Sequence, residues 1–260
     1  MKKILSYSAT IGIGLVLAIG CGDDSSSRIS EEGSKEKAHW GYTGDTAPSK
    51  WGTLDTAYKS CSEGKVQSPI NILPSLNENL KPLDLNYTAS SSSIIDNGHT
   101  VQVNIKSGSS LTIGSDVYAL KQFHFHTPSE NNIHDKSFPL EAHFVHATND
   151  GKLAVVAVMF EEGVTNTTLD MIWKKFPLEK KKEQSFSLGV AEVNSLMPKN
   201  KDYYEFMGSL TTPPCTEGVK WHVLKTHLSI SIEQKEKFLK LFGHANNRPI
   251  QDTNGRTIKE

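Results

Sequence analysis

The sequence predicts a single, mostly β domain with a few short helices on its outside. Short segments that alternate polar and apolar residues dominate from residue 66 to 160, and such alternation is typical of strands with one wet face. The run from Leu153 to Phe160 is continuous, short and rich in valine, as expected of a buried central strand. Two segments show helical spacing, so we expect an α+β protein in which the sheet dominates.

The N-terminus has the features of a signal peptide. Two lysines precede a short apolar run, Ile11–Ile19, which is shorter than the ~20 residues of a membrane span. The stretch Leu17-Ala18-Ile19-Gly20-Cys21 resembles a bacterial lipoprotein signal, in which the cysteine receives lipid. We therefore expect residues 1–20 to be a signal peptide. Lipidation of Cys21 would anchor the protein to a membrane in an extracytoplasmic space, the periplasm or cell envelope. An ordinary secretory signal with a chance cysteine is the alternative.

Residues 21–37 are expected to form a flexible tether, because they are rich in Ser, Gly, Asp, Glu and Lys and contain little to bury. The folded domain is predicted over residues 38–260. About 220 residues suit one domain with a full core. The formal charge of −1 over 260 residues shows no basic bias, so nucleic acid is not an expected partner.

The chain has three cysteines. If Cys21 carries lipid, Cys61 and Cys215 remain and can form a disulfide in an oxidising compartment. Such a bond would close a loop of about 155 residues, for which the chain-entropy model gives about 4–5 kcal/mol. Two free buried thiols are the alternative reading of the sequence.

Individual elements follow from local patterns. Thr100–Ile105 and Ser110–Ile113 alternate polar and apolar residues and are predicted strands. A first helix is predicted near Thr167–Phe176, from apolar residues at helical spacing. A second helix is predicted to begin near Ser231, because Gln234 three residues later completes a capping box.

Three histidines carry the strongest chemical signal. His124 and His126 are two residues apart in one predicted strand and therefore point to the same face; His143 lies in another. If the strands are neighbours, three imidazoles converge as in a catalytic zinc site with an open fourth position. Gln122 and Glu141 each lie two residues before a histidine, on its side of the sheet, where they could hold the second ring nitrogen.

These stretches belong to a longer series of ordered blocks: His39–Tyr42, Gln67–Ile72, Asn97–His99, Gln122–Glu130, Glu141–His146, Gly208–Cys215, Trp221 and Asn246–Pro249. Over about residues 39 to 251 the chain resembles an alpha-class carbonic anhydrase of the secreted bacterial kind. The resemblance implies a large twisted, mainly antiparallel central sheet of about ten strands with zinc at the bottom of a conical cleft. It implies a lyase with one Zn²⁺ per chain, which reversibly hydrates carbon dioxide to bicarbonate and a proton by attack of zinc-bound hydroxide.

The resemblance also assigns residues. His124, His126 and His143 match the zinc ligands, and Gln122 and Glu141 their hydrogen-bond partners. Thr211 matches a gatekeeper threonine that donates to Glu130, and His99 a proton-shuttle histidine, for which an ordinary imidazole pKa near 6.5 is suitable. The residues that match the carbon dioxide pocket and its substrate contacts are Val145, Val155, Leu210, Thr212 and Trp221. Cys61 and Cys215 match a disulfide that is common in secreted members.

One position departs from the family pattern: Asn131 stands where a histidine commonly follows the glutamate matching Glu130. We expect altered local hydrogen bonding there without loss of the zinc site. The rival functions are a catalytically silent binding module and a zinc hydrolase for esters. A purely structural zinc site is disfavoured, because it would require a fourth protein ligand. A homodimer is left open.

Overall fold

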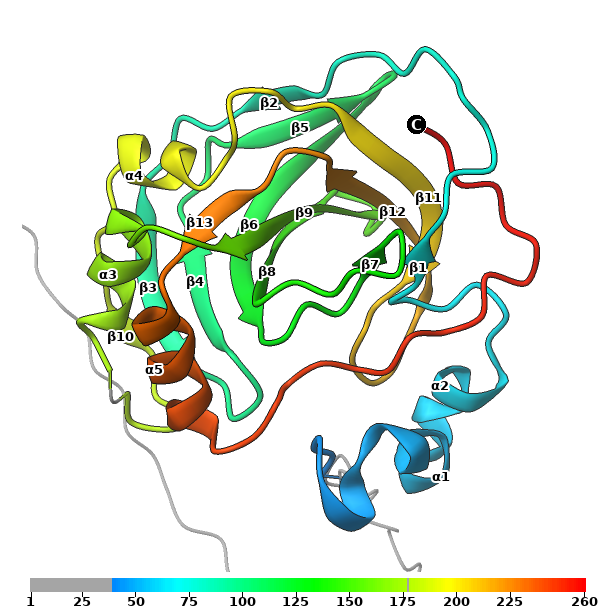
Figure 1. Ribbon diagram of the computed structural model, residues 1–260, viewed down its shortest axis with the longest axis horizontal. Coiled ribbons are helices and arrows are strands. Elements are labelled where there is room, and N and C mark those ends of the chain that lie inside the picture. The colour runs from blue at the N-terminus through cyan, green and yellow to red at the C-terminus, as the bar shows by residue number, and fades with distance from the viewer. Residues whose placement is uncertain (1–38, 177) are drawn as a thin grey trace, which may run out of the picture. The chain divides into compact units, whose positions relative to one another are not determined.

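The computed structural model describes residues 39–176 and 178–260, which fold around one large mixed sheet (Figure 1). The predicted signal peptide, tether and Cys21 lie outside the described residues, so they stay predictions. The mostly β class is confirmed, with short helices placed around the sheet.

Among the described residues the sheet has 11 strands, in the main order β10-β3-β4-β6-β8-β9-β12-β11. In addition, β5 pairs with β2 and β6, and β13 pairs with β9. Most neighbours are antiparallel, but β9 pairs in parallel with both β12 and β13. The strands are β2 (Asp84–Asn86), β3 (Ser91–Asp96), β4 (Val101–Ile105), β5 (Ser110–Ile113), β6 (Asp116–His126), β8 (Leu140–Ala147), β9 (Leu153–Glu162), β10 (Gln184–Ser185), β11 (Tyr203–Ser209), β12 (Glu217–Leu224) and β13 (Leu228–Ile230). A small separate sheet pairs β1 (Asn71–Ile72) with β7 (Asn132–Ile133).

The predicted strands are confirmed as β4, β5 and β9, and β9 lies between β8 and β12 as a central strand should. Strand β6 contains a feature that alternation does not show. Its register against β8 shifts between Leu120 and Gln122, which makes Lys121 the extra residue of a β-bulge. Tyr118 before the bulge and Phe123 after it therefore share one core face, and Gln122 is turned to the other.

The two faces of the sheet carry separate apolar clusters. The larger contains Phe123, Phe144 and Val156 and is covered by the helices of the second half of the chain. The smaller contains Val155 and Trp221. Because side chains alternate along each strand, the apolar run of β9 supplies both clusters, which explains why that run is continuous.

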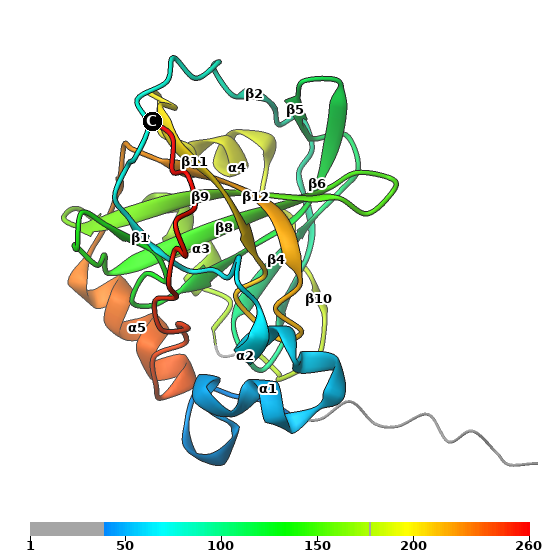
Figure 2. The same cartoon turned by 90° about the vertical axis from the view of Figure 1, so that its right-hand side faces the viewer.

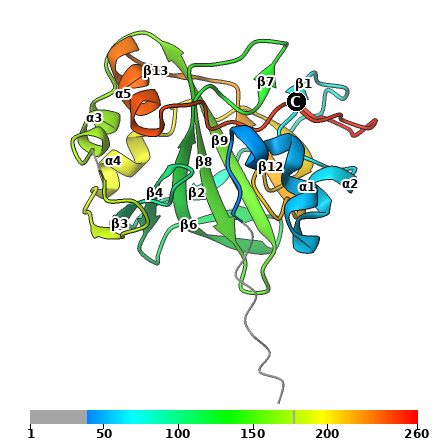
Figure 3. The ribbon, with the colours of Figure 1, turned by 90° about the horizontal axis from the view of Figure 1, so that it is seen from below.

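The α-helices are short and lie at two places in the described chain. Helices α3, α4 and α5 gather on one side, and α1 and α2 on the other, as Figures 1 and 3 show. Their bounds are α1 (Trp51–Leu54), α2 (Ser60–Glu63), α3 (Thr167–Trp173), α4 (Val190–Ser195) and α5 (Ile232–Phe242). Within the described ranges no helix is both long and apolar enough to span a membrane.

Both predicted helices are confirmed. Ser231 caps α5 in a reciprocal capping box with Gln234. Helix α3 ends at Trp173, three residues earlier than predicted. The proline that follows Phe176 disfavours helical backbone at the residue before it. The prediction was too long because it followed the spacing of the apolar side chains as far as Phe176.

The N-terminal helices form a third small cluster beside the sheet (Figure 2). It contains Trp51, Tyr58 and the disulfide between Cys61 and Cys215, with Trp40 and Tyr42 packed against it. The predicted disulfide is confirmed. It ties α2 to the segment after β11 across a sequence separation of 154 residues.

Candidate functional site

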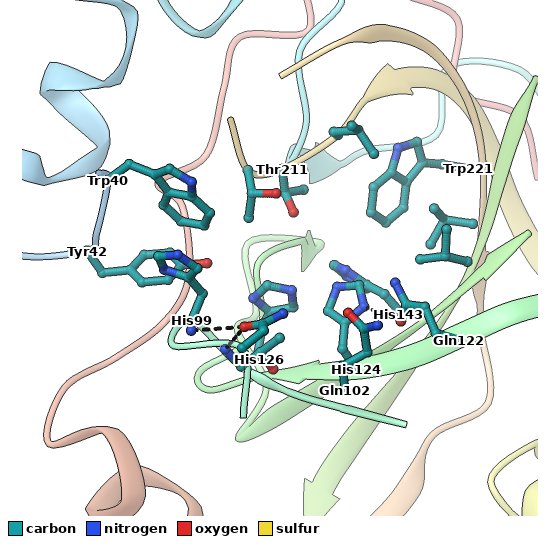
Figure 4. Close-up of a pocket in the computed structure, with 16 residues that line it drawn as sticks. Trp40, Tyr42, His99, Gln102, Gln122, His124, His126, His143, Thr211 and Trp221 are labelled. Atoms are coloured by element: carbon teal, nitrogen blue, oxygen red, sulfur yellow. Dashed lines mark hydrogen bonds between the residues drawn. The ribbon is translucent and has the colours of Figure 1, made fainter. Parts of the chain in front are cut away.

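Strands β6 and β8 bring the three predicted histidines together. In the antiparallel register His124 lies directly opposite His143, and His126 is two residues further along the same face. The three rings are 4.7 to 5.3 Å apart, centroid to centroid. One ring nitrogen of each residue lies within 4.8 Å of the others. Figure 4 shows the rings at the centre of a pocket.

The outer nitrogens of two histidines are held by the two partners that the alternation indicated. Nδ1 of His124 lies 2.9 Å from Oε1 of Gln122. Nε2 of His143 lies 2.9 Å from Oε1 of Glu141, although the pair is not aligned as a linear hydrogen bond. The opposite nitrogens, Nε2 of His124 and Nδ1 of His143, are left for a ligand.

The third histidine has a partner that the sequence did not reveal. Nδ1 of His126 donates to the backbone carbonyl of Asn246, at 2.7 Å. Every residue has a backbone carbonyl, so the residue type at position 246 could not predict this contact. The two residues are also 120 positions apart in the sequence. The Asn246 side chain also accepts a hydrogen bond from the backbone N–H of Thr127, at 2.8 Å. Asn246 therefore holds the end of β6 that carries His126.

Burial favours the neutral form of all three imidazoles. It lowers the pKa of His124 and His143 well below the usual value, and the neighbouring imidazoles add to this effect. Burial also lowers the pKa of His126, against an opposing effect of the Asn246 carbonyl. Neutral imidazoles are the form that binds a metal. Nε2 of His126 is buried without a hydrogen-bond partner among the described residues, which is what an absent metal ion would leave.

Glu141 is fully buried and is held by a set of donors. Its Oε2 accepts from the backbone N–H groups of Glu130 and Asn131, at 2.7 and 2.9 Å, and its Oε1 accepts from Nδ2 of Asn131, at 2.8 Å. Burial raises the pKa of Glu141, and the hydrogen bonds from Asn131 oppose the rise. Asn131 is the position that departs from the family pattern. Its side chain and its backbone N–H both donate to the carboxyl group that lies behind His143.

Glu130 lies behind the histidines, close to Thr211. Its Oε1 accepts from the backbone N–H of Arg248, at 2.8 Å, and its Oε2 lies 3.5 Å from Nε2 of His126. Burial raises the pKa of Glu130 well above the usual value, while hydrogen bonding from the Thr211 hydroxyl and the Arg248 backbone opposes the rise.

The pocket has a volume of about 170 Å³ and is lined by both polar and apolar side chains. Most of the predicted site residues line it: His99, Gln122, His124, His126, His143, Val145, Val155, Leu210, Thr211, Thr212 and Trp221. Glu130 and Glu141 are buried and do not line it. Five lining residues were not assigned from the sequence: Trp40, Tyr42, Asn97, Thr100 and Gln102. Trp40, Tyr42 and Asn97 lie in the quoted blocks, which was the signal that could have identified them.

His99 lies at the side of the pocket with Trp40 and Tyr42 (Figure 4). The turn that presents it is held by Asn97, whose Oδ1 accepts from the backbone N–H groups of His99 and Thr100, both at 3.0 Å. Its ring stacks on Trp40 with centroids 3.6 Å apart and planes at 7°. Burial in this stack, with charges nearby, lowers the pKa of His99 to about 4. The ordinary imidazole pKa assumed from the sequence therefore does not apply in this position.

Comparisons with known proteins agree in one family. The model of the eukaryotic-type carbonic anhydrase family matches residues 46–260. A carbonic anhydrase of Pectobacterium atrosepticum is 46% identical over 225 residues, which cover 86% of this chain and 92% of the relative. One from Neisseria gonorrhoeae is 46% identical over 226 residues, covering 85% and 88%. Among solved structures, the alpha-carbonic anhydrase of Thermovibrio ammonificans, in complex with the inhibitor sulfanilamide, superposes with a TM-score of 0.82. It has 40% identity over 86% of this chain and 99% of that one.

Proposed function

The chain belongs to the alpha-class, eukaryotic-type carbonic anhydrase family, an enzyme family of carbon dioxide hydration, and on this premise we propose that it hydrates carbon dioxide with one zinc ion held by His124, His126 and His143. The substrate pair is carbon dioxide and bicarbonate. The observation that carries the proposal is the convergence of three imidazoles whose burial favours the neutral form, each with its second nitrogen 2.7 to 2.9 Å from an oxygen.

The donor set fits zinc. Three imidazole nitrogens lie within 4.8 Å of one another, and the three residues line the pocket. A zinc ion held by these three residues would keep one position for water or substrate, which is the pattern of catalytic zinc sites. The held outer nitrogens fix the tautomers and the ring orientations. When bound there, zinc would lower the pKa of water to about 7 and so supply hydroxide at neutral pH.

Thr211 and Glu130 orient the nucleophile in this proposal. Hydrogen bonding from the Thr211 hydroxyl lowers the pKa of Glu130 against the effect of burial. With that proton directed to Glu130, the Thr211 oxygen would accept a hydrogen bond from a group inside the pocket. The Arg248 N–H holds the carboxyl group from behind. The pair thereby selects one orientation of the attacking oxygen, so that a lone pair is aimed at the substrate.

The apolar wall suits carbon dioxide. Val145, Val155, Leu210 and Trp221 line the pocket beside the histidines, and such a surface accepts a small apolar molecule without leaving polar groups unpaired. The charged product is less well accommodated there, which favours its release. Thr212 also lines the pocket and is the proposed polar contact of the substrate. We assign His99, at the side of the pocket, to the removal of the proton.

The experiment is stopped-flow carbon dioxide hydration by the purified protein, with its zinc content quantified. We expect fast hydration that disappears on chelation and returns with zinc. His124→Ala should lose both stoichiometric zinc and activity. His134→Asn is a matched control, because His134 is an exposed imidazole outside the pocket, with a φ of 49° that asparagine tolerates. Stoichiometric zinc without hydration above background would reject the enzyme and favour a silent binding module.

We further propose that the protein acts in an extracytoplasmic compartment and is anchored through lipid at Cys21. The disulfide supports an oxidising compartment, and the sequence before residue 22 supports the anchor. Mass spectrometry of the mature N-terminus tests this: a lipid-modified Cys21 is expected, and an unmodified peptide that starts elsewhere would contradict it. The homodimer stays an open prediction.

A further inference from the structure

Two more histidines lie around His99 at the mouth of the pocket. The ring of His39 is 6.3 Å from that of His99, centroid to centroid. On the other side, the Tyr42 ring is 6.5 Å from His99 and 6.1 Å from His244. His39 is exposed and His244 is half-buried, so both reach solvent. The mouth therefore carries three imidazoles and the Tyr42 ring.

His244 has a defined tautomer when it is neutral. It follows Gly243, which ends helix α5 with a φ of 72°, and its Nδ1 lies 2.8 Å from the carbonyl oxygen of Ala245. A carbonyl oxygen only accepts, so Nδ1 carries the hydrogen. Nε2 then holds the lone pair and can accept a proton.

The surroundings of His99 prevent it from storing a proton. Burial, followed by the charges of His39, Lys181 and His244, lowers the pKa of His99 to about 4. At pH 7 an imidazole with that pKa is protonated in about 1 molecule in 1000. A proton that reaches His99 must therefore pass on at once, and efficient transfer requires an acceptor nearby.

We propose that His244 is a second proton acceptor at the pocket mouth, which takes protons from His99 and gives them to buffer bases in solution. This inference rests on the proposed function. The proton leaves a ring N–H of His99, forms an N–H at Nε2 of His244 and then bonds to a buffer base, so both imidazoles return to their neutral forms. The Tyr42 ring is 6.5 Å from the His99 ring and 6.1 Å from the His244 ring, and no hydrogen bond joins the two histidines among the described residues. Ordered water must therefore bridge the transfer.

The kinetic test uses the zinc-loaded full-length protein and the variant His244→Gln, which keeps a donor for the Ala245 carbonyl but cannot carry a proton. At low buffer concentration we expect kcat to fall about twofold, because one of the parallel routes from His99 to solvent is lost. We expect kcat/KM to be unchanged, because it reports the steps up to bicarbonate release. A high concentration of imidazole buffer should restore kcat. His134→Asn is the control.

A second readout is independent of activity. In the metal-free protein, NMR titration of the imidazole signals should show an upward shift of the His99 pKa in His244→Gln, because one of the electrostatic effects that lower that pKa is removed. His134→Asn should leave that pKa unchanged. Equal buffer dependence of wild type and His244→Gln would overturn the proposal, and so would a loss of kcat seen only in His39→Gln. An inactive wild-type protein would instead reject the proposed function. In that case the NMR titration still tests the coupling, and an equal His99 pKa in wild type and His244→Gln would overturn it.

Discussion

Replacing Asn246 with alanine should weaken the fold and the metal site together. The Asn246 side chain is fully buried. It accepts from the Thr127 N–H at 2.8 Å and donates to the carbonyls of Phe125 and His99 at 2.9 and 3.0 Å. These three bonds contribute about 1 kcal/mol each, and the Thr127 N–H, left buried and unpaired, adds about 1–2 kcal/mol. The free energy of unfolding should therefore fall by about 4–5 kcal/mol.

The metal site should suffer because the Asn246 backbone also holds a ligand. Its carbonyl accepts from Nδ1 of His126 at 2.7 Å, and the variant frees that backbone to shift. Loss of such an orienting partner typically costs about 10- to 100-fold in metal affinity.

Urea unfolding of the metal-free protein measures the stability, and competition with a chromogenic chelator measures the zinc affinity. Asn247→Ala is the matched control, because the side chain of Asn247 is half-exposed and next in sequence. The reasoning would be refuted if Asn246→Ala unfolded within about 1 kcal/mol of the wild type and bound zinc equally well.

Three further predictions concern Thr211, Cys215 and His146. Thr211→Val should lower kcat/KM by about 100-fold with zinc retained, because Glu130 loses the hydroxyl that orients the nucleophile; an unchanged rate would remove Thr211 from the mechanism. Cys215→Ser should lower the free energy of unfolding by about 4–5 kcal/mol, since it opens a loop closed across 154 residues to Cys61; wild-type and variant denaturation curves that coincide only after reduction would support this. Burial lowers the pKa of His146 to about 3, so between pH 6.5 and 3 the unfolded chain binds the extra proton and acid destabilises the fold. From pH 7 to 5 this residue alone should cost about 2 kcal/mol, and His146→Gln should show a shallower loss in urea titrations at the two pH values.

The sequence by itself determined the features that depend on local period and local chemistry. Alternation places His124 and His126 on one face with Gln122, because successive side chains of a strand point to opposite sides. The same period predicted that Glu141 lies on the side of His143. The capping box of α5 was also readable, since its two residues are three positions apart and satisfy each other's backbone groups.

The tertiary structure decided what depends on distant segments. The pairing of β6 with β8 sets His143 opposite His124, and the bulge at Lys121 changes which face the earlier part of β6 presents. The carbonyl of Asn246 reaches His126 across 120 positions, and no residue type encodes such a contact. Stacking on Trp40 buries His99 and lowers its pKa to about 4. Periodicity fixes the direction of a side chain, but its neighbours, and hence its burial and proton affinity, are set only when remote parts of the chain pack around it.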